Sequence, residues 1–119
     1  MASYEITVET GDMEGAGTNA DVYITLYGED GTAGPIRLND GRDNFERDDV
    51  DRFKLDLARI GRLDCVHIAH DNGGARPGWF LNRVVVDDGR ETVDFPAYRW
   101  LSTEENDGQT EVTLTRPRG

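Results

Sequence analysis

The stretch DNFERDDVDRFKLDL, residues 43–57, combines a strand signal with a candidate metal loop. In its second half Phe53, Leu55 and Leu57 alternate with charged residues, and a period of two is typical of a strand with one buried face. Its first half crowds acidic and amide side chains around Phe45, and so much like charge is costly unless a cation neutralises it. Oxygen donors on a loop that leads into a rigid strand are the ligands that calcium prefers. The stretch therefore predicts a strand preceded by a calcium loop.

The same alternation recurs along the chain, with turn-forming glycine and proline residues between the apolar segments. In one of these segments Val22, Ile24 and Leu26 share a face. No segment shows a helical period of useful length. Strands that recur about every 8–12 residues with turn signals between them indicate an all-β sandwich. The further strands are expected at residues 4–9, 22–27, 36–38, 63–70, 79–86, 92–95, 98–101 and 110–115.

Length and charge limit the classes of protein to which the chain can belong. We expect its 119 residues to form a single domain, residues 1–119, with a core at about 4–115. The net charge of -11 repels the phosphate backbone of nucleic acids, and it opposes binding to anionic lipid unless a cation bridges the two. The sequence shows no signal peptide and no apolar run long enough to cross a bilayer. We expect a soluble protein, cytoplasmic if the chain is complete, and the sequence leaves the compartment otherwise open.

The sequence offers little for catalysis or for zinc binding. The segment CVHIAH brings Cys65, His67 and His70 close together, but the two histidines are an odd number of positions apart and face opposite sides of a strand. The single cysteine has no partner for an internal disulfide, and we expect it to be buried and inert. There is no nucleophile motif and no phosphate-binding loop. We therefore predict that the protein is not an enzyme.

Four segments resemble, in their order and spacing, the PLAT domain, which is also called the lipoxygenase homology or LH2 domain. They are TGDMEGAGTNADVYITLYG, NFERDDVDRFKL, HDNGGARPGWFLNRVVV and FPAYRWLS, and the resemblance extends from about Tyr4 to Leu114. It implies a sandwich of two four-stranded antiparallel sheets. It also implies calcium in loops at one end of the sandwich, and association with lipid or membranes through aromatic side chains on loop tips.

The resemblance places calcium ligands on two loops, which match the family elements GT(D/N) and (N/D)(D/N)FE. These ligands are Gly17, Thr18, Asn19, Asp43, Asn44 and Glu46. A carboxylate pair that calcium-binding members often carry before the aromatic pair is replaced here by Pro77 and Gly78, which leaves Asp71 as the remaining acid of that loop. Fewer charged ligands imply weak calcium binding, with a Kd of roughly 10⁻⁴ to 10⁻³ M. The alternative is that these acids only solvate the loops.

Aromatic residues bear on the choice between binding functions. The expected loop tips carry no aromatic residue and only one large apolar side chain, Met13. We interpret Trp79, Phe80, Tyr98 and Trp100 as core residues because they lie within strand patterns. This favours a calcium-binding module that mediates protein interaction. The alternatives are a module that binds a lipid or membrane surface with calcium, and a regulatory or targeting domain of a lipase- or lipoxygenase-type enzyme.

Overall fold

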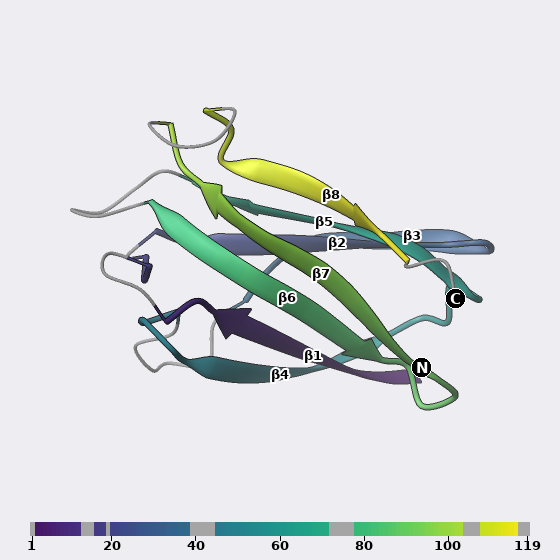
Figure 1. Ribbon diagram of the computed structural model, residues 1–119. Coiled ribbons are helices and arrows are strands. Elements are labelled where there is room, and N and C mark those ends of the chain that lie inside the picture. Colours follow the sequence, from purple (N-terminus) through teal and green to yellow (C-terminus); the bar gives the residue numbers. More distant parts are fainter. Residues whose placement is uncertain are drawn as a thin grey trace.

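The computed structural model describes residues 2–12, 16–18, 20–38, 45–71, 78–103 and 108–116. Its strands form two four-stranded antiparallel sheets, in the orders β4-β1-β6-β7 and β3-β2-β5-β8, which lie face to face (Figure 1). The predicted β-sandwich is therefore confirmed. The described ranges hold no helix, and so none that is long and apolar enough to span a membrane. The strands are β1 (Ala2–Thr10), β2 (Val22–Gly28), β3 (Gly31–Arg37), β4 (Val50–Leu57), β5 (Leu63–His70), β6 (Trp79–Asp87), β7 (Thr92–Leu101) and β8 (Glu111–Thr115).

Pairing between the strands fixes which side chains enter the core. Ile6 of β1 lies opposite Phe53 of β4 and Val86 of β6, and in the other sheet Ile24 of β2 lies opposite Ile68 of β5. Because side chains alternate along a strand, each of these apolar residues points between the two sheets. All of them are buried. Alternation in the sequence thus predicted the inner faces correctly.

One predicted division of strands is wrong. Residues 92–95 and 98–101 belong to the single strand β7. Its register with β6 shifts between Leu81 and Arg83, and Tyr98 adopts a φ of 50°. Such a bulge lets a strand at the edge of a sheet continue past a proline, here Pro96. A sequence pattern cannot show this irregularity, because the bulge interrupts the alternation that identifies the strand.

The four aromatic residues expected in the core are divided between the inside and the outside. Trp79 is fully buried, and its Nε1 donates a hydrogen bond to Thr10 Oγ1 at 2.9 Å. Phe80 and Trp100 are half-buried on the outer face of their sheet, and Tyr98 is 55% exposed. Neighbouring residues of a strand face opposite sides, so Trp79 and Phe80 cannot both enter the core. The core interpretation is therefore right for Trp79 and wrong for Phe80, Tyr98 and Trp100, none of which belongs to the core cluster.

A loop residue completes the core next to Trp79. The ring of Phe45 is 4% exposed; it stacks on Phe53 with 5.8 Å between centroids and meets Trp79 edge-on at 5.3 Å. The φ of Phe45 is 61°, a left-handed conformation that costs a non-glycine residue roughly 1–2 kcal/mol. Burial of a phenylalanine side chain contributes about 1.5–3 kcal/mol and offsets that cost. The acidic loop before β4 is therefore anchored by an aromatic contact.

Cys65 lies on the outer face of β5 and is half-buried, whereas we expected it to be fully buried. Burial raises the pKa of its thiol, and the neighbouring Asp64 carboxylate raises it further. A raised pKa keeps the sulfur as a thiol near neutral pH, and the thiolate is the reactive form. The expectation of an inert cysteine is thus supported by its electrostatics rather than by complete burial.

Phe45→Ala is expected to lower the free energy of unfolding by about 3–5 kcal/mol, because it removes a ring that fills the space between Phe53 and Trp79. Urea denaturation followed by circular dichroism measures the change. Phe80→Ala is the matched control, since that ring is only half-buried on the outer face and its removal should cost clearly less. Equal losses in the two variants would show that Phe45 is not a core residue.

Iodoacetamide should alkylate Cys65 more slowly in the native protein than in the urea-unfolded protein at the same pH, because the raised pKa lowers the thiolate fraction. Asp64→Asn should recover a minor part of the rate, since burial is the larger cause of the shift and Asp64 the smaller. Mass spectrometry over time measures both rates. The same rate in native and unfolded protein would contradict this assignment.

Candidate functional site

Residues 16–18 lie against the loop that precedes β4, at the end of the sandwich where β1 ends and β4 begins (Figure 1). The Thr18 amide donates a hydrogen bond to the Phe45 carbonyl at 2.9 Å. Gly17 packs closely against this loop, since a Cβ there would lie only 3.0 Å from the same carbonyl oxygen. The Thr18 hydroxyl accepts a hydrogen bond from the Ala20 amide at 3.1 Å. The structure therefore brings together the described parts of the two elements that were expected to hold calcium.

Carboxylates hold the acidic loop in shape. Asp51 Oδ2 accepts a hydrogen bond from the Phe45 amide at 2.8 Å, and Asp49 Oδ2 accepts one from the Glu46 amide at 3.2 Å. The side chain of Glu46 is exposed, and within the described ranges its carboxylate forms no hydrogen bond or ion pair. The acids of this loop thus have separate tasks. Asp49 and Asp51 fix the backbone, and Glu46 presents a carboxylate to solvent.

Asp71 lies where β5 ends, next to the start of β2. Its amide donates to the Asp21 carbonyl at 3.0 Å, and its Oδ1 accepts a hydrogen bond from the Asp21 amide at 3.1 Å. Asp21 in turn forms an ion pair with Arg37 at 3.0 Å. One oxygen of Asp71 therefore joins two strand ends, which is a structural role that the sequence did not predict.

Three of the expected calcium ligands, Asn19, Asp43 and Asn44, lie outside the described residues. Among the residues that are described, no group of three or more His, Cys, Asp or Glu side chains could hold a metal ion. The donors that are described, the carbonyls of Gly17 and Thr18 and the carboxylates of Glu46 and Asp71, are hard oxygen ligands and fit calcium in kind. Calcium takes roughly six to eight oxygens, so these donors need the other loop residues to complete a site.

The two histidines face opposite sides of β5, as their spacing predicted. His70 is buried, and its Nε2 donates a hydrogen bond to the Leu101 carbonyl at 2.7 Å. His67 is on the outer face, with Nδ1 at 2.9 Å from Thr113 Oγ1 and Nε2 at 3.8 Å from Glu111 Oε1. His70 is thus bonded to β7 of the opposite sheet, and His67 to β8 of its own sheet.

An aromatic pair adjoins the segment at residues 16–18. Phe80 and Trp100 pack edge to face on the outer surface of the sheet, with 5.4 Å between centroids and an angle of 80° between ring planes. The Phe80 amide donates to the Ala16 carbonyl at 2.9 Å, and the Phe80 carbonyl accepts from the Gly11 amide at 2.9 Å. Gly11 is needed there, because a Cβ would lie 2.6 Å from the Phe80 ring. The sequence carried a signal for this pair, since the alternation that places Trp79 inside places Phe80 outside.

Arg83 holds Tyr98 in place on the same face. Its Nη2 donates to the Tyr98 hydroxyl at 2.9 Å, its Nη1 donates to Asp94 Oδ2 at 3.2 Å, and its Nε lies 3.4 Å from Glu9 Oε2. The hydrogen bond to Tyr98, followed by the charges of Asp94 and Glu9, raises the pKa of the Arg83 guanidinium. The exposed tyrosine ring is thereby fixed beside a permanently charged arginine. We name Phe80, Arg83, Tyr98 and Trp100 the aromatic face.

The PLAT/LH2 domain model matches residues 4–115 of the chain. Lipoxygenase homology domain-containing protein 1 of Homo sapiens is 45% identical over 108 residues, which cover 89% of this chain and 5% of that protein. Polycystin-1 of Homo sapiens is 40% identical over 113 residues, which cover 91% of this chain and 3% of that protein. A crystal structure of coral 8R-lipoxygenase, described as showing calcium activation via a C2-like domain, superposes with a TM-score of 0.86 at 27% identity and covers 98% of this chain and 17% of that one. The chain thus spans a small part of each of these proteins. It belongs to the PLAT/LH2 domain family.

Proposed function

We propose that this chain is a non-enzymatic calcium-binding module that docks a protein partner on its aromatic face. The observation that carries the proposal is the position of residues 16–18 between the acidic loop and the aromatic face. On one side Thr18 donates a hydrogen bond to Phe45, and on the other Ala16 accepts one from Phe80, each at 2.9 Å. Because one short segment touches both places, a cation that orders the loop also steadies the docking surface.

The proposed calcium ligands are those that the resemblance implied. Three observations support them: the hard oxygen donors of the two loops, the hydrogen bond between Thr18 and Phe45, and the similarity to coral 8R-lipoxygenase with its calcium activation via a C2-like domain. Calcium would supply the positive charge that the crowded acids lack. The ligands are Gly17, Thr18, Asn19, Asp43, Asn44 and Glu46, with Asp71 as a further carboxylate, and the Kd is roughly 10⁻⁴ to 10⁻³ M.

The aromatic face has the composition of a protein-binding surface. Tyrosine, tryptophan and arginine are the residue types that dominate the energetics of protein interfaces. Since Arg83 already holds Tyr98 by a hydrogen bond, the ring loses little conformational freedom when a partner binds. Exposed Glu5, Asp87 and Asp94 lie on the same face of the sheet. A partner that combines basic with aromatic or aliphatic residues would complement this surface.

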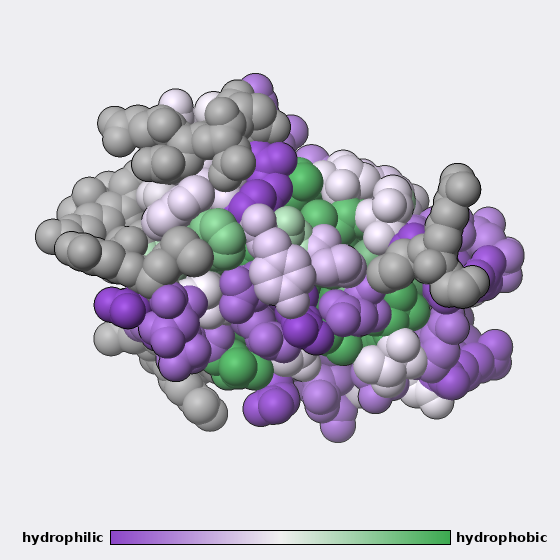
Figure 2. Space-filling model, viewed as in Figure 1, coloured by the Kyte–Doolittle hydropathy of each residue, from purple (hydrophilic) through white to green (hydrophobic). Residues whose placement is uncertain are grey.

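Calcium-dependent binding to a lipid or membrane surface is the second candidate, because Phe80 and Trp100 lie close to the acidic loop. Three features favour a protein partner. The aromatic residues stand on a sheet face and not on a loop tip, and Figure 2 shows hydrophilic residues between separate hydrophobic areas in its view of the molecule. The net charge of -11 also opposes adsorption to anionic lipid. A regulatory or targeting domain of a lipase- or lipoxygenase-type enzyme is a third candidate, which rests on the similarity to coral 8R-lipoxygenase.

Calcium is expected to stabilise the native protein through the loop that contains Glu46. With a Kd on the order of 10⁻⁴ M and about 10 mM calcium, selective binding to the native state gives about 2.7 kcal/mol and raises the melting temperature by several degrees. Glu46→Gln should be neutral or slightly stabilising without calcium, because it removes one of several crowded charges, and should abolish most of the shift with calcium. The backbone hydrogen bond of Glu46 to Asp49 is retained in this variant, since it uses the amide nitrogen.

Differential scanning calorimetry with calcium, with magnesium and with neither measures the effect. Magnesium should give a smaller shift, because irregular loops do not readily supply its octahedral geometry. The control is Asp56→Asn, which removes one exposed carboxylate from β4 and should keep the full calcium shift. The calcium hypothesis would be contradicted by the absence of a shift in the wild type, or by an equal loss of stability in Glu46→Gln with and without calcium. Either result would show that the acidic loop has only a structural role.

Removal of the Tyr98 ring should weaken protein docking. Peptides selected from a random displayed library against the native chain in calcium should lose affinity by about tenfold or more in Tyr98→Ala. Tyr27→Ala is the matched control, because Tyr27 is 38% exposed on the other sheet and should leave the affinity unchanged. Fluorescence anisotropy of the labelled peptides gives both constants. Peptides that bind wild type and Tyr98→Ala equally would show that the partner docks elsewhere.

Vesicle sedimentation separates the protein-docking function from the lipid-binding function. Because of its negative charge, the chain should remain in the supernatant with phosphatidylcholine and phosphatidylserine vesicles without calcium, and millimolar calcium should change this only modestly. Strong sedimentation that does not require calcium would make lipid binding the leading function.

A further inference from the structure

A pocket lies at the end of the sandwich opposite the acidic loop, and no function described so far uses it. It has a volume of about 400 Å³, a size common for small-molecule sites. Residues of three separate turns line it: 29–30 between β2 and β3, 59–62 between β4 and β5, and 88–91 between β6 and β7. β1 begins and β8 ends at this end of the molecule (Figure 1).

Backbone hydrogen bonds hold two of these turns together before any ligand binds. The Asp30 amide donates to the Ile60 carbonyl at 2.8 Å, and the Glu29 amide donates to the Arg62 carbonyl at 3.0 Å. The Ile60 amide in turn donates to the hydroxyl of Tyr4 at 3.3 Å, and this tyrosine is buried below the pocket. The walls of the pocket are therefore preorganised, which lowers the entropic cost of binding.

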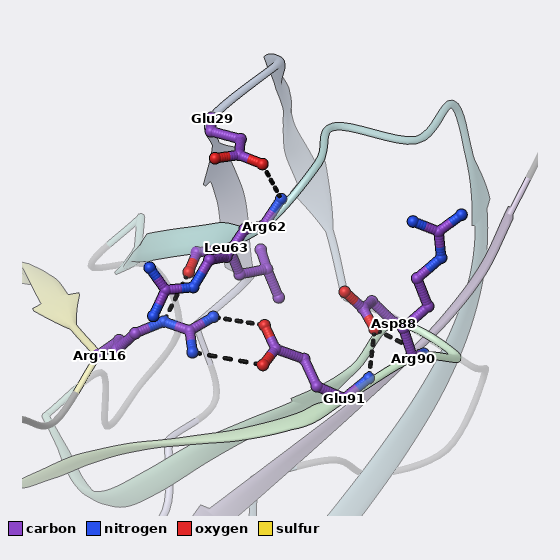
Figure 3. A network of polar contacts seen from close by, with 7 residues as sticks. All are labelled: Glu29, Arg62, Leu63, Asp88, Arg90, Glu91 and Arg116. Atoms are coloured by element: carbon purple, nitrogen blue, oxygen red, sulfur yellow. Dashed lines mark hydrogen bonds and ion pairs between the residues drawn. The ribbon is translucent and has the colours of Figure 1, made fainter. Parts of the chain in front are cut away.

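The carboxylates of Asp88 and Glu91, in the turn between β6 and β7, already form contacts within the protein. Glu91 forms an ion pair with Arg116 at 2.5 Å and a second hydrogen bond with it at 3.4 Å. This contact lowers the pKa of Glu91, so that the pair stays charged. Asp88 is buried, and its Oδ1 accepts hydrogen bonds from the amides of Arg90 and Glu91, each at 2.8 Å (Figure 3). Two of the acids at the pocket are thus neutralised or bonded by groups of the chain itself.

The arginines that line the pocket differ from these two acids in their contacts. Among the described residues, the guanidinium groups of Arg59, Arg62 and Arg90 have no hydrogen bond or ion pair, although the charge of Arg62 helps to lower the pKa of Glu91. Figure 3 shows the Arg90 side chain extending away from Asp88 and Glu91. In a chain of net charge -11, three exposed arginines thus line one preformed pocket, together with four acidic residues. The Asp30 carboxylate at the same pocket accepts no hydrogen bond within the described ranges either.

We propose that this pocket binds the phosphate monoester of a small hydroxylated molecule. The planar guanidinium fork matches the oxygens of a phosphate, and three arginines among the residues that line the pocket favour an anionic ligand. The Asp30 carboxylate accepts a hydrogen bond from a hydroxyl group of the same ligand. Binding is modest, because the surrounding acids weaken the field of the arginines. The pocket shares no residue with the proposed calcium ligands or with the aromatic face, so a test of the pocket does not depend on either of them.

Titration of the ¹⁵N-labelled chain with glycerol 3-phosphate tests the proposal by NMR. Saturable shifts are expected at the amides of residues 29–30, 59–62 and 88–91, with a Kd on the order of 1 mM that rises with salt concentration. Arg62→Gln and Arg90→Gln should each raise the Kd about fivefold or more. Arg52→Gln is the matched control, because it removes an exposed arginine from β4, away from the pocket, and should leave the Kd unchanged. Well-dispersed spectra of the free variants confirm that each has folded.

Further ligands identify the chemistry and its source. Asp30→Asn should reduce the preference for glycerol 3-phosphate over inorganic phosphate, because only the former carries alcohol hydroxyl groups. Sedimentation with phosphatidylcholine vesicles, with and without phosphatidic acid, shows whether a lipid headgroup also reaches the pocket, and such binding supports the site only if Arg62→Gln and Arg90→Gln abolish it. No saturable shift with glycerol 3-phosphate and no arginine-dependent vesicle binding would overturn the proposal. Equal weakening in Arg52→Gln would also overturn it, since nonspecific charge would then explain the binding.

Discussion

The insertion of Phe45 between Phe53 and Trp79 is the contact on which the functional end of this sandwich depends. This contact holds the acidic loop against the core, although repulsion among the carboxylates of the loop opposes that position. The strained backbone of Phe45 directs its carbonyl to Thr18, so the same residue that fills the core also fixes the facing loop. A hydrophobic contact thus sets the position of the hydrophilic groups of the loop.

The sandwich separates three surfaces of different chemistry. One end of the sandwich carries acidic residues that suit a hard cation, and the opposite end has a pocket that arginines line. The outer face of one sheet, between these two ends, carries the aromatic residues. The net charge of -11 does not predict the local electrostatic field at any of these surfaces, because that field depends on which carboxylates already form hydrogen bonds or ion pairs. At the pocket Arg116 neutralises Glu91, while at the loop the Glu46 carboxylate has no such partner within the described ranges.

The sequence predicted most of the strands, because inner-facing residues such as Ile6 and Ile24 keep a strict period of two, but it began β3 at residue 36 instead of residue 31. The family resemblance implied two elements that the structure brings together, Gly17 and Thr18 against Phe45 and Glu46. Alternation could have shown that Phe80 lies outside, but not that Tyr98 is exposed, because a bulge resets the pattern in β7. The arginine pocket could not be predicted, since its residues come from three turns that approach one another only through the register of both sheets.

Amide hydrogen exchange, measured residue by residue with and without calcium, tests whether the acidic loop and the aromatic face are coupled. Calcium should slow exchange at Thr18, whose amide bonds to Phe45, and at Phe80, whose amide bonds to Ala16, because both hydrogen bonds are made by the segment between loop and face. The amides of Glu29 and Asp30, at the opposite end, should exchange at the same rate in both conditions. Slower exchange at Thr18 but not at Phe80, or no change at either amide, would contradict the account.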